Sequence, residues 1–283
     1  MYCLGIETSC DDTCVAIIKD FYTILSNVIS NQIEVHRRYG GVVPEVASRR
    51  HLECLIPVLD QACQQAGVTL KQIDCVAVTR GPGLNGSLLM GLCLGKIISL
   101  IHQKPFIAVN HLEGHLFASR LDHSDLIPPF IALIVSGGHT ELILVEDWGQ
   151  YVILGRTRDD AAGEVYDKIA KYLNIGYPGG PQIDVRSKNG NPMRFHFRGG
   201  LEDQKNFDLS FSGLKTAVIR TYDQFSDSDK KNENTINDLL ASFQHSVIRT
   251  LWKKALRAVR ETGVNKISLG GGVSANSTLR AQF

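Results

Sequence analysis

Short apolar segments alternate with longer segments of helical periodicity along the chain. Near the N-terminus, residues 2–6, 13–19 and 22–30 predict three strands joined by tight turns. The following segments predict a helix from Pro44 to about residue 66, a strand at 74–79, a helix at 86–101, a strand at 106–109 and a further helix. Pro57 lies inside the first of these helices and predicts a kink. The predicted order is therefore βββαβαβα.

The same order begins again near residue 131. Strands are predicted at 131–136, 140–145 and 151–156, and a helix at 161–173. An irregular polar segment at 174–210 precedes a pair of helices within 211–262, a strand at 266–269 and a last helix. Two copies of one topology predict an α/β protein of two duplicated lobes around a nucleotide-binding cleft. We place the first lobe at residues 1–125 and the second at 126–283.

Loops rich in glycine, serine and threonine lie at equivalent places in this topology, at 5–13, 136–140 and 270–276. Glycine allows a ligand close to the backbone, and a helix N-terminus adds favourable partial charge for an anion. None of these loops is a Walker motif or a Gly-x-Gly-x-x-Gly fingerprint. One such loop alone is more often an ordinary turn. Several in register across two lobes predict a site for a phosphate or a nucleotide.

Two histidines, His111 and His115, lie four residues apart in a segment predicted to be helical. Side chains at this spacing face the same way, so both imidazoles can reach one metal ion. Geometry argues against a metalloprotease. In a His-Glu-x-x-His motif the glutamate directly follows the first histidine, whereas Glu113 lies two residues after it and on the opposite side of the helix. A metal ion beside an anion-binding turn indicates chemistry on a phosphorylated substrate.

Charge and cysteine content limit the partners and the cellular compartment that the sequence predicts. Lys and Arg total 30 against 29 Asp and Glu, so any nucleic-acid contact must come from a local patch. The seven cysteines are odd in number and form no Cys-x-x-Cys pair, which predicts reduced thiols. No signal peptide is visible, and glycines, serines and a lysine interrupt the apolar segment 84–101, which argues against a membrane span. We therefore expect a cytoplasmic protein with no membrane association.

Many sequence blocks occur in the order and spacing of one known family: Gly5–Asp12, Gly40–Glu45, Gly81–Leu84, His111–His115, Val135–Thr140, Asp160–Glu164, Tyr177–Pro181, Phe211–Thr216 and Gly270–Asn276. Together they resemble the bacterial form of the universal tRNA threonylcarbamoyladenosine transferase family, within the actin/sugar-kinase/Hsp70 superfamily. The resemblance covers the whole chain and implies two actin-like (RNase H-like) lobes. It also implies transfer of a threonylcarbamoyl group from threonylcarbamoyl-adenylate to N6 of adenine 37, in tRNAs that read codons beginning with A.

The resemblance assigns roles to residues of the second lobe. The adenylate phosphate and the acyl group would lie on Ile134, Val135, Ser136, Gly137 and Gly138. The ribose and the base would contact Asp167, Gly180, Asp184 and Asn276. From the residues alone, Asp167 is equally well explained as a solvated helix charge. Asn276 can be a helix N-cap, with or without a ligand contact.

Other polar residues have two alternative roles each. Asp11 and Asp12 resemble the acidic pair of the superfamily's first phosphate loop and would orient or deprotonate the attacking amine, although an Asx-rich turn is almost equally plausible. Lys215 is either structural or a tRNA contact. Four basic side chains share one helix face, which fits a solvated surface better than phosphate binding: Arg249, Lys253, Arg257 and Arg260.

The resemblance also implies a cofactor and partners. His111 and His115 would hold one divalent metal ion, Fe²⁺ or Zn²⁺, which acts as a Lewis acid on a carbonyl or phosphoryl oxygen. The partners would be tRNA, threonylcarbamoyl-adenylate, a small ATPase, and an inactive paralogue of similar fold that forms a heterodimer through the first lobe. An ATP-dependent small-molecule kinase of the same superfamily is the main alternative, but it would not need the histidine pair. An inactive scaffold paralogue would be expected to lack that pair.

The C-terminal end of the sequence raises a further expectation. In the family, the block 270–276 opens a helix, and a later aspartate is the third protein ligand of the metal. Here the sequence stops at Phe283, in the apparent middle of that helix. Catalytic zinc sites normally use three protein ligands. We therefore expect a truncated second lobe that binds metal weakly and transfers poorly.

Overall fold

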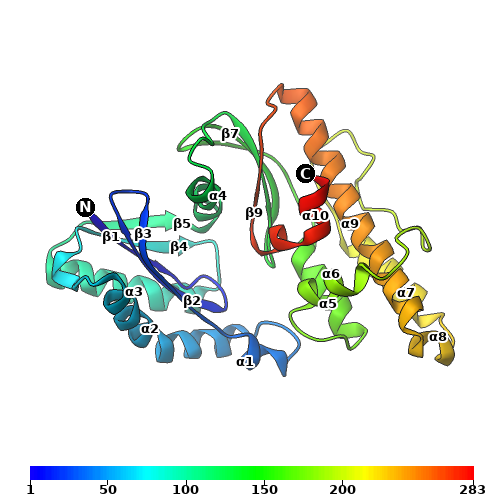
Figure 1. The fold of residues 1–283 in the computed structure, drawn as a ribbon, viewed down its shortest axis with the longest axis horizontal. Coiled ribbons are helices and arrows are strands. Elements are labelled where there is room, and N and C mark those ends of the chain that lie inside the picture. The colour runs from blue at the N-terminus through cyan, green and yellow to red at the C-terminus, as the bar shows by residue number, and fades with distance from the viewer. The chain divides into compact units, whose positions relative to one another are not determined.

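The computed structural model describes residues 1–283, with the exception of the Asp122 side chain. The chain forms two compact units, Met1–Gly114 and His115–Phe283 (Figure 1). The division falls inside α4 (His111–Asp122), the helix that carries both histidines. The lobe boundary that we placed after residue 125 stays a prediction.

Unit 1 is built on a five-stranded sheet with the order β3-β2-β1-β4-β5. The strands β1, β2 and β3 are antiparallel neighbours, whereas β4 and β5 continue the sheet in the direction of β1. The elements are β1 (Tyr2–Glu7), β2 (Asp12–Lys19), β3 (Thr23–Asn31), α1 (Ile33–Arg37), α2 (Pro44–Ala66), a 3-10 helix (Leu70–Gln72), β4 (Cys75–Gly81), α3 (Asn85–His102) and β5 (Phe106–Asn110). The helices α2 and α3 contact each other and the sheet, and enclose one apolar core.

Small residues bring α3 close to this sheet. A Cβ atom at Gly91 would lie 3.4 Å from the Ile6 side chain, and one at Gly95 would lie 3.3 Å from Phe106. Within the described part of the chain, α3 is the one helix long and apolar enough to cross a membrane by length and composition alone. That test is also met by core helices, and α3 packs on β4, so it is weak evidence for a span.

The predicted elements of unit 1 are all present, and two short ones are added, α1 and the 3-10 helix Leu70–Gln72. The short helix α1 was not predicted, because five residues carry too little periodicity to be recognised. The helix α2 continues from Pro44 through Pro57 to Ala66. All seven cysteines are free, as the sequence predicted.

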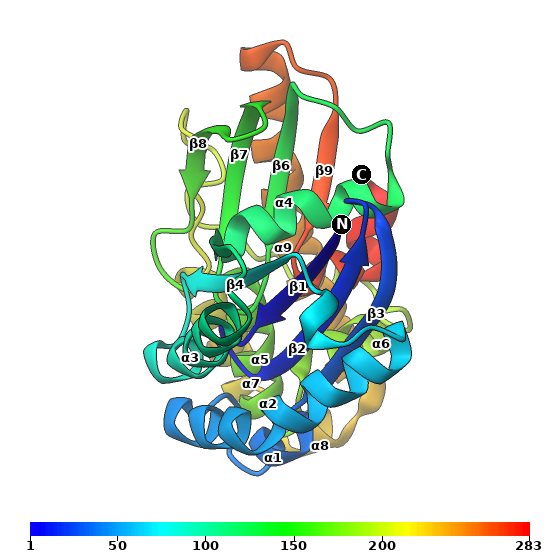
Figure 2. The same ribbon diagram turned by 90° about the vertical axis from the view of Figure 1, so that its left-hand side faces the viewer.

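Unit 2 repeats the pattern of three antiparallel strands and one parallel strand. Its sheet has the order β8-β7-β6-β9, and Figure 2 shows these strands side by side. The elements after α4 are β6 (Phe130–Val135), β7 (Thr140–Asp147), β8 (Gln150–Arg156), α5 (Ala162–Tyr172), α6 (Gly179–Ser187), α7 (Ser212–Asp223), α8 (Asp227–Lys231), α9 (Glu233–Thr262), β9 (Ile267–Gly270), a 3-10 helix (Gly272–Ala275) and α10 (Ser277–Gln282). The predicted duplication is therefore confirmed.

Two predictions for unit 2 were wrong in detail. The segment 174–210 is not wholly irregular, because it contains α6, which buries Ile183 in the core. The predicted helical pair within 211–262 consists of three helices, since the one-turn α8 stands between α7 and α9. Both helices are short, so they carry little periodicity. Burial of Ile183 stabilises α6, whereas α8 buries no side chain and is capped by Ser226, which accepts from the Asp229 N–H at 3.2 Å.

The basic face of α9 is only partly a solvated surface, because Arg260 and Lys253 are exposed while the others contact the protein. Arg249 and Lys253 form ion pairs with Glu202, whose side chain is 5% exposed, at 3.0 and 2.5 Å. Lys254, which is 1% exposed, donates from Nζ to the carbonyl oxygens of residues 204 and 206 at 3.1 and 2.7 Å. Arg257 donates to the same two carbonyls. These side chains fix the irregular segment 199–208 to α9.

Candidate functional site

The loop between β6 and β7 is a closed turn. The backbone N–H of Ser136 donates to the carbonyl of His139 at 2.7 Å, and the His139 N–H donates to Ser136 Oγ at 3.1 Å. Gly137 and Gly138, at the tip of the turn, have no other atoms within 4 Å of an added Cβ position. An open cavity of about 380 Å³ begins at Gly138 and is lined by residues 138–141 and 156–159. The turn therefore presents backbone groups to an accessible space.

The helix α5 begins directly against this turn. The N–H of Gly163 donates to the Ser136 carbonyl at 3.2 Å, and the N–H of Ala162 donates to Thr140 Oγ1 at 2.9 Å. A Cβ atom at Gly163 would lie 2.6 Å from the Ser136 carbonyl oxygen and 3.0 Å from Gly137 Cα. Only glycine allows this approach. The N-terminus of α5 and its partial positive charge thus face the turn.

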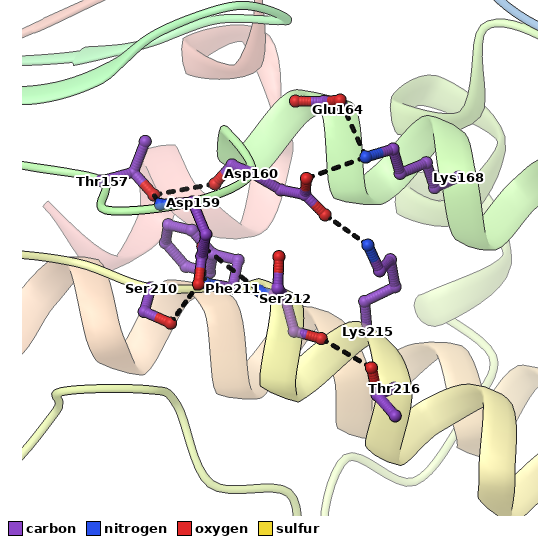
Figure 3. Close-up of polar contacts among 10 residues, drawn as sticks. All are labelled: Thr157, Asp159, Asp160, Glu164, Lys168, Ser210, Phe211, Ser212, Lys215 and Thr216. Carbon is purple, nitrogen blue, oxygen red and sulfur yellow. Dashed lines mark hydrogen bonds and ion pairs between the residues drawn. The ribbon is translucent and has the colours of Figure 1, made fainter.

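A polar network holds the start of α5 against α7 (Figure 3). The carboxylate of Asp160 accepts from Lys168 at 2.8 Å and from Lys215 at 2.5 Å. The neighbouring Asp159 accepts from the backbone N–H groups of Phe211 and Ser212 at 2.8 and 3.3 Å. Burial by itself raises the pKa of Asp160, but the two lysines outweigh it and lower the pKa. Lys215 is therefore a structural residue in this network.

Asp167 lies on α5, one turn after Gly163. One oxygen of its carboxylate accepts from the N–H of Gly179 at 2.7 Å, which places the start of α6 beside α5. The next residue, Gly180, has no atoms within 4 Å of an added Cβ position. The predicted ribose ligand and the predicted glycine therefore lie close together, with open space at the glycine.

Asp184 and Asn276 belong to a second polar cluster, centred on Gln244 of α9. Asp184 accepts from Gln244 at 3.2 Å and from the backbone N–H of Ser277 at 3.1 Å. Asn276, which is 8% exposed, caps α10 by accepting from the N–H of Leu279 at 2.9 Å. Its amide nitrogen donates to Gln244 at 2.7 Å. The helix-capping role is thus present, and a ligand contact by Asn276 stays a prediction. Gln244 was missed because a glutamine inside a long helix carries no recognisable motif.

The glycine loop after β9 packs against the end of β6, directly before the turn at Ser136. A Cβ atom at Gly270 would lie 2.9 Å from the Ile134 side chain and 3.3 Å from the carbonyl of His115. Gly271 has a φ of +87° and lies against the carbonyl of Val135. Unit 2 therefore brings together the predicted segment 134–138, the glycine loop and the backbone of the second histidine.

The first histidine is bound to a carboxylate that the sequence analysis missed. Nδ1 of His111 lies 3.2 Å from Glu7 Oε2 and 3.2 Å from Ser9 Oγ. Glu7 also accepts from the Ser9 N–H at 2.5 Å and from the Thr79 hydroxyl. Burial raises the pKa of Glu7, but the hydrogen bonds from His111, Ser9 and Thr79 outweigh it and lower the pKa to about 2. A charged residue at the inner end of an apolar strand was the available signal.

The acidic pair lies at the β1–β2 turn of unit 1. Burial, followed by the charges of Asp11 and Glu7, raises the pKa of Asp12 to about 6. Beside the pair, the buried His51 donates from Nε2 to the carbonyl of Cys10 at 2.9 Å, while its Nδ1 lies 2.7 Å from the Thr13 hydroxyl. Asp12 is therefore a carboxylate that can take up a proton near neutral pH.

Comparisons with known proteins identify the family of this chain. The family described as tRNA N6-adenosine threonylcarbamoyltransferase (TsaD) matches residues 23–283. Among curated proteins of that name, the one from Kosmotoga olearia is 50% identical over 281 residues, which are 99% of this chain and 82% of the relative. The one from Clostridioides difficile is 49% identical with the same coverage of both chains.

Solved structures show the fold alone. HypF from T. kodakarensis has a TM-score of 0.61 at 14% identity, over 99% of this chain and 43% of its own. Component A of (R)-2-hydroxyglutaryl-CoA dehydratase from Acidaminococcus fermentans has a TM-score of 0.56 at 15% identity, over 100% of this chain and 87% of its own. Both support two actin-like lobes. The chain itself belongs to the tRNA N6-adenosine threonylcarbamoyltransferase family.

Proposed function

We propose that this transferase takes its acyl group from threonylcarbamoyl-adenylate and modifies N6 of adenine 37, in tRNAs that read codons beginning with A. The observation that carries the donor assignment is the turn at Ser136–Gly138, closed on itself and backed by the N-terminus of α5. Such a turn offers N–H groups and partial positive charge to a phosphate. The other parts of the donor, and the tRNA acceptor, are assigned from the family resemblance.

The adenylate would extend from this turn along α5 and α6. The Asp167 carboxylate can accept from the ribose hydroxyls, while Gly180 allows the nucleoside close to the backbone. Asp184 and Asn276 already hold the α6–α9–α10 cluster together, so we assign them to shaping this end of the site as well as to contacting the nucleoside. A ligand here is bound mainly by unit 2.

The reaction needs little covalent help, because a carbamoyl–phosphate mixed anhydride already has a good leaving group. The N6 amine attacks the carbamoyl carbon, the bond from that carbon to the phosphate oxygen breaks, and AMP leaves. The proton lost from N6 passes to a carboxylate, and we assign that role to Asp12 because its raised pKa of about 6 suits a base. Burial and, after it, the charge of Asp11 raise the pKa of Asp12. We expect no covalent enzyme intermediate.

His111 and His115 would hold a divalent metal ion, Fe²⁺ or Zn²⁺. The structure supports this donor set, because metal-ligating histidines usually bond their second ring nitrogen to a carboxylate, as His111 bonds to Glu7. Because Nδ1 is thereby occupied, Nε2 of His111 would be the nitrogen that holds the ion. When bound, the ion would polarise an oxygen of the substrate. Within the described residues, no group of three His, Cys, Asp or Glu side chains is poised for a metal.

A partner protein would cover an apolar face of unit 1. Large apolar side chains on α2 and α3 are between 50 and 79% exposed: Leu52, Ile56, Leu89, Ile97, Leu100 and Ile101. On α3, residues 89, 97 and 101 share one helix face, and α2 contacts α3. Several exposed large apolar side chains on two neighbouring helices favour a protein interface. We propose that an inactive paralogue of similar fold binds here, that a small ATPase joins this complex, and that the complex works in the cytoplasm.

One experiment tests the function. The protein is incubated with threonylcarbamoyl-adenylate made with labelled threonine and with unmodified tRNA, both alone and with the paralogue and the ATPase. Labelled threonylcarbamoyladenosine at position 37 and stoichiometric AMP are the expected products. The proposal fails if label never reaches tRNA, and phosphorylation of a small molecule by ATP would instead support the kinase alternative.

A further inference from the structure

The loop at residues 37–43, between α1 and α2, has no role in the function as described so far. It contains two successive arginines, Arg37 and Arg38, followed by Tyr39 and two glycines. The guanidinium carbon of Arg38 lies 4.8 Å from the centre of the Tyr39 ring, and the Tyr39 side chain is exposed, at 41%. A stacked arginine and tyrosine at a surface offer both a cation and an aromatic face.

Buried side chains fix this loop in position. His36, fully buried, donates from Nε2 to Gln32 at 3.1 Å and accepts the backbone N–H of Val43 at 3.3 Å. Gln32 in turn donates to the carbonyl of Ala47 on α2 at 3.4 Å. One imidazole therefore links both ends of the loop, and the exposed Arg38 is held on an ordered support.

The loop also lies next to the acidic pair. Asp12 on β2 pairs with Asn31, the last residue of β3, and α1 begins two residues later. On the other side, His51 of α2 donates to the carbonyl of Cys10. Burial lowers the pKa of His36, the charge of Asp11 raises it, and the charge of Arg38 lowers it. The segment that carries Arg38 thus follows the strand that pairs with Asp12, and it leads into α2, which contacts the turn beside Asp12.

Basic residues here are more available than those on α9. Arg37 and Arg50 are ion-paired with glutamates of their own helices, at 2.9 and 2.8 Å and with both partners largely exposed. Among the described residues, no ion pair involves Arg38 or Arg49, and both are exposed. On α9, in contrast, Arg249 and Lys253 share the nearly buried Glu202, and Arg257 pairs with Glu261. Exposed ion pairs are weak, so the 37–50 region keeps a local positive charge.

We propose that the 37–43 loop binds the single-stranded anticodon loop of the tRNA, with Arg38 on a backbone phosphate and Tyr39 stacked on an unpaired base. Single-stranded RNA is recognised by bases stacked on aromatic and arginine side chains, and its phosphates by cations. The chain has almost no net charge, so tRNA needs a local patch of this kind. The inference rests on tRNA as the acceptor and adds the surface that presents its adenine.

The test compares variants for RNA binding and for turnover, using the protein with the partners that its activity requires. The probe is a fluorescent anticodon stem-loop RNA with unmodified adenine 37, measured by anisotropy over a range of NaCl concentrations. Arg38→Glu is expected to weaken binding at least about tenfold and to make the slope of log K against log[salt] shallower by about 0.7. Tyr39→Leu is expected to weaken binding about tenfold, whereas Tyr39→Phe keeps the stacking and binds normally.

Arg220→Glu is the matched control, because Arg220 is an exposed arginine on α7 of unit 2 and undergoes the same change of charge. The KM for tRNA should rise in the loop variants, while the KM for the adenylate stays unchanged. Thermal midpoints check that each variant is folded. The inference is overturned if Arg38→Glu and Tyr39→Leu bind the RNA no more weakly than Arg220→Glu. Absence of any transfer to tRNA by the unaltered protein would instead contradict the proposed function.

Discussion

Replacement of Gly163 by alanine tests whether the turn at Ser136 depends on the close approach of α5. The added Cβ atom would lie 2.6 Å from the Ser136 carbonyl oxygen, closer than such contacts occur, and both atoms belong to backbone that cannot rotate away. Relief requires α5 to move outward, which lengthens the 3.2 Å hydrogen bond from the Gly163 N–H. Overpacking costs about 1–3 kcal/mol and the hydrogen bond about 1 kcal/mol. Alanine's better helix propensity offsets about 1 kcal/mol.

The expected net loss is therefore about 1–3 kcal/mol in the free energy of unfolding of unit 2. Both tryptophans, Trp148 and Trp252, lie in unit 2, so their fluorescence during urea titration follows that unit. The control is Gly213→Ala at the start of α7, where an added Cβ has no atoms within 4 Å, and stability should hold or rise. Adenylate affinity should fall only for the Gly163 variant. Equal stability and equal affinity in both variants would refute the reasoning.

Other predictions concern the proposed base, the metal site, the irregular segment 199–208 and the protein interface. Because catalysis needs ionised Asp12, the transfer rate should fall as pH drops through about 6, and Asp12→Asn should remove this dependence along with most activity. Glu7→Gln should weaken metal affinity about 10–100-fold in a chelator competition, and an unchanged affinity would exclude its orienting role. Lys254→Met removes the hydrogen bonds from a buried ammonium to the carbonyls of residues 204 and 206, which then keep only Arg257 as a donor, and should cost about 2 kcal/mol in urea unfolding, whereas exposed Lys188→Met should cost almost nothing. Leu100→Asp should abolish co-elution with the paralogue and leave adenylate binding intact, and persistent co-elution would place the interface elsewhere.

The local sequence pattern was sufficient to predict an element wherever that element is long or its pattern is repeated. The alternating burial of β2 and the unbroken apolar β6 are visible as sequence periodicity, and the repeated strand order follows from it. The Ser-Gly-Gly turn and the two histidines are contiguous motifs, so their chemistry was also readable. Function followed from many such blocks in one order.

The tertiary structure decided which polar residues meet across long separations. Glu7 and His111 are 104 residues apart, and Gln244 joins Asp184 to Asn276 across 60 and 32 residues. No periodicity records such pairs, because each partner satisfies its local rules alone. The same holds for the α9 face, where exposure was expected but Glu202 and two backbone carbonyls bind several of the cations. Sequence determined the elements and their chemistry through short-range sterics and burial, whereas hydrogen bonds between distant segments decided the roles of single side chains.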